Sequence, residues 1–263
     1  MKRHIRTLLN ALGVFAVLVA LWQVIIWTFH VPSFMLPSPA QVAATLVTRF
    51  SPLAQSLLIT AEEAGGGLLL SIFAGVAVSL VFAQSAWLRR MFYPYTILLQ
   101  TVPIIAVAPL ILMWAGSGEW SVTLISFIIC LAPIIANTTQ GMISVDENLQ
   151  HLFLMHNASS AQTLFKLRLP HAIPNLFVGI RISAGISVIG AITGELFAGS
   201  SRVGQGGLGY SILYASAQLQ TAYLFALVIA ASVLGFAFFF LAMFFEWYFL
   251  HNWHQSTRAL EAA

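Results

Sequence analysis

The sequence predicts an all-α integral membrane protein with six transmembrane helices. Of its 263 residues, 59% are hydrophobic and only 7% are charged, whereas a soluble domain carries about 25% charged residues on its surface. Long uncharged apolar runs also recur along the chain. The net charge of +3 is too dilute for a nucleic-acid-binding surface. We therefore expect membrane lipid as a partner and no nucleic acid.

Six runs satisfy the length that a membrane-spanning helix requires, which is about 20 mainly apolar residues. The first follows Lys2, Arg3 and Arg6 and has no small-x-small cleavage site after it, so we predict a retained anchor helix within residues 1–31 rather than a signal peptide. The remaining spans form a helical core within 55–250, and the whole chain, 1–263, forms one transmembrane domain. The predicted spans are 8–29, 57–83, 92–115, 120–143, 176–199 and 220–246.

The distribution of Lys and Arg predicts the orientation, because cytoplasmic loops retain these residues. If the N-terminus is cytoplasmic, nine of the 11 basic residues lie on the cytoplasmic side and only Arg49 and Arg202 lie outside. Both termini are then cytoplasmic. The longest cytoplasmic insertion is about 144–175, while segments at about 30–56 and 200–219 lie outside.

Residues 147–169 of the insertion predict two short amphipathic helices. Their apolar residues follow the i, i+3, i+4 spacing of one helix face. Asn157 suits a left-handed turn between the helices, and Ser159 and Ser160 are good N-caps. Pro170 is expected to close the second helix. Such a hairpin either lies on the membrane surface or docks on a cytoplasmic partner.

Several motifs resemble those of one transporter family. The segment from Ala158 to Arg181, which contains Lys166-Leu-Arg-Leu-Pro170-His-Ala-Ile-Pro174, resembles the second half of the "EAA" loop in permease subunits of bacterial ATP-binding-cassette importers. Leu36-Pro-Ser-Pro39, Thr101-Val-Pro-Ile-Ile-Ala-Val-Ala-Pro109, and Gly194-Glu-Leu-Phe-Ala-Gly199 followed by Gly207-Leu-Gly209 are similar to the nitrate, sulfonate and taurine branch of that family. The resemblance covers roughly residues 32–210.

The resemblance implies a role and a set of partners. The chain would be the permease core in the bacterial inner (plasma) membrane, paired with a second permease copy, a cytoplasmic ATPase dimer and an extracytoplasmic solute-binding protein. The chain has no phosphate-binding loop, because neither Lys2 nor Lys166 follows a glycine. We therefore expect no catalytic residue and no cofactor in this chain, with ATP hydrolysed by the partner. Cys130, the single cysteine, excludes a cysteine-based metal cluster, and we expect no metal site.

The resemblance also assigns the insertion, at 145–170, to ATPase coupling. The family loop opens with Glu-Ala-Ala and has a glycine at its turn, where this chain has His151, Leu152, Phe153 and Asn157. The expected docking surface thus keeps its shape and loses an anion. The coupling residues that the resemblance predicts are His151, Leu152, Phe153, Asn157, Ala158, Leu164, Phe165 and Pro170.

Ionisable residues and prolines inside spans are candidates for the translocation path, because both are costly in a membrane. Glu195 either lines the path or gates it, pairs with Arg202, or lies at the outer interface. Glu62 and Glu63 either contact substrate or lie at the interface. Pro103 and Pro109 are expected to kink their span, and either line the pore or only shape the helix.

Two other protein classes are disfavoured, because the chain shows one acid embedded in a span, no visible repeat and no histidine in the middle of a span, whereas two substrate classes remain open. An ion-coupled secondary transporter would carry buried relays and inverted repeats, and an intramembrane enzyme would need a histidine within a span. For substrate, Gly190-Ala-Ile-Thr-Gly194-Glu195 is similar to permeases for a thiamine-precursor pyrimidine or riboflavin. The acidic residues near the spans also favour these solutes over sulfonate, taurine or nitrate, which remain the alternative.

Overall fold

The protein is helical throughout the part that the structure, a computed structural model, describes, namely residues 2–198 and 206–251. A π-helical turn, η1 (Leu164–Arg168), connects α8 to α9 without a break. The helices are α1 (Lys2–Phe29), α2 (Pro39–Thr48), α3 (Phe50–Gln84), α4 (Ala86–Thr101), α5 (Ile104–Ala115), α6 (Glu119–Ile143), α7 (Glu147–Met155), α8 (Ser160–Thr163), α9 (Leu169–Ala198), α10 (Leu208–Ala217) and α11 (Thr221–Leu250).

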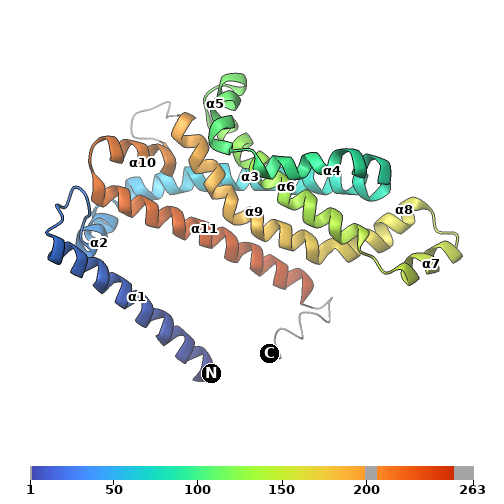
Figure 1. The fold of residues 1–263 in the computed structure, drawn as a ribbon, viewed down its shortest axis with the longest axis horizontal. Coiled ribbons are helices and arrows are strands. Elements are labelled where there is room, and N and C mark those ends of the chain that lie inside the picture. The colour runs from blue at the N-terminus through green and yellow to red at the C-terminus, as the bar shows by residue number, and fades with distance from the viewer. Residues whose placement is uncertain (1, 199–205, 252–263) are drawn as a thin grey trace.

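Helices α3, α6 and α9 form the centre of an elongated bundle, and α11 packs along α9 (Figure 1). The hairpin of α7 and α8 lies at one end, and α2 and α10 lie at the opposite end. Helix α5 projects from the bundle and α1 diverges from it. The segment predicted to be cytoplasmic is thus separated by the length of the bundle from the two segments predicted to be outside.

Small residues allow the central helices to approach closely. A Cβ atom on Gly67 of α3 or on Gly190 of α9 would overlap Ser126 of α6. Hydroxyls reinforce this packing, since Ser126 donates to Ser187 O at 3.1 Å and Ser71 donates to Phe127 O at 2.8 Å. Such contacts stabilise helix association in lipid, where the hydrophobic effect does not drive it. They fix α3, α6 and α9 as one unit.

The described residues support four or five membrane spans rather than all six predicted ones. Four continuous helices are long and apolar enough, namely Phe50–Gln84, Glu119–Ile143, Ser160–Ala198 and Thr221–Leu250. The α4–α5 pair is a fifth candidate, as a broken span. The predicted anchor at 8–29 is helical, but its apolar part, Gly13–Phe29, is shorter than these spans.

The predicted span 92–115 is broken rather than kinked. Helices α4 and α5 meet at an angle of 102°. Val102 is extended, as expected for a residue before proline, and Pro103 is the N-cap of α5. Pro109 lies inside α5 without ending it. The expected distortion at Pro103 is confirmed, although its size exceeds a kink.

Pro170 does not end the second helix of the insertion, so that prediction is wrong. The helix continues from Ser160 to Ala198. Pro170 is the second residue of α9, directly after the π-helical turn in which Leu169 N donates to Leu164 O. A proline near the start of a helical segment removes only one backbone hydrogen bond, and the wider π turn before it accommodates the ring. The hairpin of α7 and α8 is therefore continuous with a candidate membrane span.

Candidate functional site

The hairpin of α7 and α8 has the turn that its sequence predicts. Asn157 has φ +50°, in the left-handed region. Ser159 caps α8, because its Oγ accepts from Gln162 N at 3.2 Å while Gln162 Oε1 accepts from Ser159 N at 2.8 Å. Asp146 Oδ1 accepts from Asn148 N at 2.7 Å and caps α7 through this single hydrogen bond. Local capping thus fixes both helices of the hairpin.

One face of the hairpin is apolar and exposed. No residue of α7 is buried, and Met155 at its end is 81% exposed. His151 and Asn157 are also exposed, while Phe153 and Ala158 are half-buried. The exposed large apolar side chains are Leu149, Leu152, Leu154, Met155 and Phe165. Exposed apolar side chains of this size, where they gather, are typical of interaction sites.

The other face of the hairpin is packed on the bundle. Leu164 is only 3% exposed and packs with Ala83 of α3, Met142 of α6 and Ala172 of α9. Pro170 is half-buried. Of the residues predicted to couple to a partner, Leu164 thus supports the hairpin from inside, whereas Leu152 and Phe165 present apolar surface outward.

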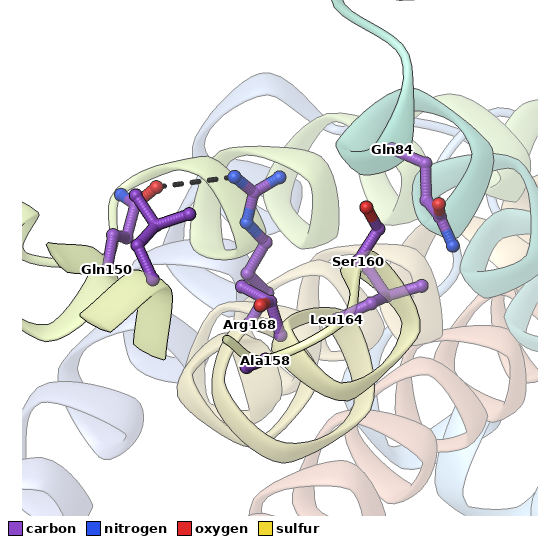
Figure 2. Close-up of a pocket in the computed structure, with 8 residues that line it drawn as sticks. Gln84, Gln150, Ala158, Ser160, Leu164 and Arg168 are labelled. Carbon is purple, nitrogen blue, oxygen red and sulfur yellow. Dashed lines mark hydrogen bonds between the residues drawn. The ribbon is translucent and has the colours of Figure 1, made fainter. Parts of the chain in front are cut away.

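A small pocket lies between the hairpin and the end of α3, and two of its residues were missed by sequence reasoning (Figure 2). Arg168 Nη1 donates to Ala83 O at 2.5 Å, and its Nη2 donates to Gln150 Oε1 at 3.3 Å. Gln150 Nε2 in turn donates to Val145 O at 2.9 Å. The sequence signal for this contact was Arg168 itself, the second basic residue of the Lys-Leu-Arg-Leu-Pro motif. That signal did not identify the residues that Arg168 contacts.

Glu195 lies in a second polar cluster, near the end of the bundle where α2 and α10 lie. It is 3% exposed, and its Oε1 accepts from Thr60 Oγ1 at 2.6 Å while its Oε2 accepts from Gly209 N at 2.5 Å. Thr60 Oγ1 also accepts from Leu208 N at 2.8 Å. The carboxyl group thus joins α9 to α3 and to the first turn of α10. Arg202, the other partner considered for Glu195, lies outside the described residues.

The Gly207-Leu-Gly209 motif fits against this carboxyl group. A Cβ on Gly207 would overlap the Glu195 carboxyl oxygens, and a Cβ on Gly209 would overlap Ile192 O. The first turn of α10 reaches the carboxyl group only because these positions lack side chains. The motif identified in the sequence therefore has a packing reason.

Glu62 and Glu63 have different surroundings. Glu63 is 6% exposed and lies against Glu195, and its Oε2 has no hydrogen-bond partner. Glu62, one residue earlier on α3, is exposed. The predicted path residues are thus brought together only in part, because Glu63 and Glu195 meet while Pro103 and Pro109 are exposed on α5. Among the described residues, no three His, Cys, Asp or Glu side chains are grouped to hold a metal ion.

The chain is similar to known transport permeases. Residues 67–248 match the family model described as "Binding-protein-dependent transport system inner membrane component". A probable ABC transporter permease protein of Haemophilus influenzae is 33% identical over 86% of this chain and 91% of its own. The formylaminopyrimidine transport permease protein ThiX of Halalkalibacterium halodurans is 31% identical over 89% of this chain and 92% of its own.

Similarity extends to other named permeases and to a solved structure. Permeases named for riboflavin, aliphatic sulfonates, taurine and nitrate are 26% to 34% identical to this chain. A structure of the MetNI methionine ABC transporter in inward-facing conformations shares the fold, with a TM-score of 0.50 and 19% identity over 76% of this chain and 96% of that chain. The chain belongs to the family of inner membrane permease components of binding-protein-dependent ABC importers, and it is a multi-pass, non-catalytic transport subunit.

Proposed function

We propose that two copies of this chain form the translocation path of the importer, with six spans per copy and both termini cytoplasmic. The proposal counts α1 as the sixth span. It is supported by the broken α4–α5 segment, which presents large exposed apolar side chains at Ile105, Met113 and Trp114. A second copy would cover this surface. An ion-coupled secondary transporter, the alternative considered from the sequence, does not fit the family.

We further propose that the α7–α8 hairpin docks on the cytoplasmic ATPase dimer. The observation that supports this proposal is the apolar outward face at Leu152, Met155 and Phe165, set on a hairpin whose inner face is anchored by Leu164. The hairpin is also continuous with α9 through η1, so a force on it reaches a membrane span directly. His151 stands where the family motif has glutamate, and the surface is therefore apolar rather than acidic.

Co-purification with the ATPase tests the docking proposal. Leu152→Asp places a charge in the apolar face, and we expect the ATPase subunit to be lost from the purified complex, because burying an unpaired carboxylate is costly. Val47→Asp is the control, since Val47 is also apolar and exposed but lies on α2, at the other end of the bundle. Retention of the ATPase by the Leu152 variant would refute the assignment.

We propose that Glu195 acts as a gate at the outer part of the path, by holding α10 against α3 and α9. Its two carboxyl oxygens are bonded to Thr60 and to Gly209, so α10 can move away from the bundle only when these bonds break. Glu63 lies beside it and contributes the second carboxyl group. We also propose that the path includes Glu62, Pro103 and Pro109. These residues are exposed in one copy, and a second copy would face them.

For the substrate, we propose a small organic solute such as a thiamine-precursor pyrimidine or a riboflavin-like compound. Two relatives named for such solutes, ThiX and the riboflavin permease RibX, are 31% and 34% identical to this chain. Calorimetry on the partner binding protein, with formylaminopyrimidine, riboflavin, taurine, an alkanesulfonate and nitrate, tests the proposal. Tight binding of taurine, alkanesulfonate or nitrate would overturn it.

A further inference from the structure

The C-terminal end of α3 is held by two arginines. The last carbonyls of a helix have no partners within it, and cations are favourable there. Arg89 Nη1 donates to Phe82 O at 3.2 Å, and Arg168 Nη1 donates to Ala83 O at 2.5 Å. Arg89 belongs to the adjacent helix α4, whereas Arg168 comes from the coupling hairpin. The two side chains therefore cap the same helix end from different elements.

Arg168 makes a second contact that Arg89 lacks. Its Nη2 donates to the side chain of Gln150 on α7, and the two side chains point toward each other across the pocket (Figure 2). The guanidinium group is planar and offers several donors in fixed directions, so one side chain can hold two acceptors in a set geometry. Gln150 is itself oriented by Val145 O. A continuous polar connection thus runs from α7 to the end of α3.

This connection matters because α7 has little other packing. It has no buried residue, whereas the second half of the hairpin buries Leu164 against α3, α6 and α9. The position of α7 relative to α3 therefore depends on the Arg168–Gln150 connection and on the chain at its two ends. Helix α3 then runs the length of the bundle to Thr60, which bonds to Glu195 and Leu208 at the far end.

We infer that Arg168 is a positioning residue that transmits movement of α7 to α3 when the ATPase subunits close. The inference rests on the proposed docking of the hairpin on the ATPase, and it adds a role for a residue that does not face the partner. Docking would be a property of the apolar face. Transmission would be a property of the Arg168–Gln150 connection.

Distance measurements on the full complex in lipid nanodiscs test the inference without knowledge of the substrate. Spin labels are placed on Met155→Cys at the end of α7, or on Val47→Cys at the opposite end, and distances between the two permease copies are measured by electron resonance with and without ATP and vanadate. Cys130 is fully buried and does not compete for the label. In the otherwise unchanged protein we expect ATP and vanadate to change both distances.

Four further substitutions separate transmission from helix capping. Arg168→Ala and Gln150→Leu should leave the Met155 change intact, while the population showing the Val47 change falls about tenfold, as expected from the loss of a hydrogen bond to a charged group. Arg168→Lys should resemble Arg168→Ala, because an ammonium does not span both acceptors. Arg89→Ala, which removes a cap on the same helix end without touching α7, should behave like the parent protein.

The outcomes distinguish this inference from the proposed docking. An unchanged Val47 response in both Arg168→Ala and Gln150→Leu overturns the inference, and so does an equal loss in Arg89→Ala, which would indicate capping alone. Loss of the ATPase from the Gln150→Leu complex also overturns it, because the connection would then serve docking. If neither distance changes in the parent protein while the ATPase is bound, the docking assignment itself fails. If Arg168→Ala does not fold, Gln150→Leu alone decides.

Discussion

Removing the Glu195 carboxyl group should destabilise the bundle by an amount that can be derived from its contacts. Glu195→Leu leaves one buried donor, the Gly209 N–H, without an acceptor, whereas the Thr60 hydroxyl still has Ser56 O at 3.1 Å as an acceptor. An unsatisfied buried donor costs about 1–3 kcal/mol, so the free energy of unfolding should fall by about 1–3 kcal/mol. Glu195→Gln keeps one acceptor and should lose about half of this.

The assay is thermal unfolding of the purified protein in detergent, followed by tryptophan fluorescence. We expect the midpoint of Glu195→Gln to lie below that of the parent protein, and the midpoint of Glu195→Leu to lie lower still. Glu62→Gln is the matched control, because it removes an acid that is exposed and close to the cluster in sequence, and such changes stay within about 0.5 kcal/mol. If Glu195→Leu unfolds at the temperature of the parent protein, the carboxyl group does not hold α10 to α3 and α9.

Two further predictions concern the other motifs of the chain. Gly207→Ala should lower the unfolding midpoint in the same assay, because the new Cβ would overlap the Glu195 carboxyl group. The control is Gly235→Ala, whose Cβ would meet no atom within 4 Å, and which should be neutral or should stabilise α11 by up to about 1 kcal/mol. Equal effects of the two substitutions would contradict the packing argument. His151→Glu restores the family residue at an exposed position of α7, and the amount of co-purified ATPase should stay the same or increase. Complete loss of the ATPase would show that the partner surface is built around histidine.

Features that depend on nearby residues were the ones that the sequence predicted well. Four of the predicted spans lie on α3, α6, α9 and α11, because an apolar run of sufficient length has no stable state in lipid other than a helix. The turn at Asn157 was also predicted, because its φ of +50° and the Ser159 cap depend only on residues close in the sequence. The angle of 102° at Pro103 was not predicted, because hydropathy gives the length of a span and not its direction.

The site depends on tertiary neighbours, which explains what sequence reasoning missed. Successive helix residues point about 100° apart, so Glu63 faces Glu195 while Glu62 is exposed, and nothing local distinguishes the two. The connection through Arg168 joins residues 85 and 18 positions away in the chain. Pro170 was expected to end a helix by a local rule, but the helix continues through η1 with tertiary support from Leu164 and its neighbours.

Native mass spectrometry of the complex purified through this 28.6 kDa chain tests the central claim most directly. The account predicts an assembly of two copies of the chain with two copies of an ATP-hydrolysing subunit, and it predicts that Leu152→Asp leaves the pair of permease copies without the ATPase. A single copy of the chain that binds no ATPase in the unsubstituted protein would contradict the account.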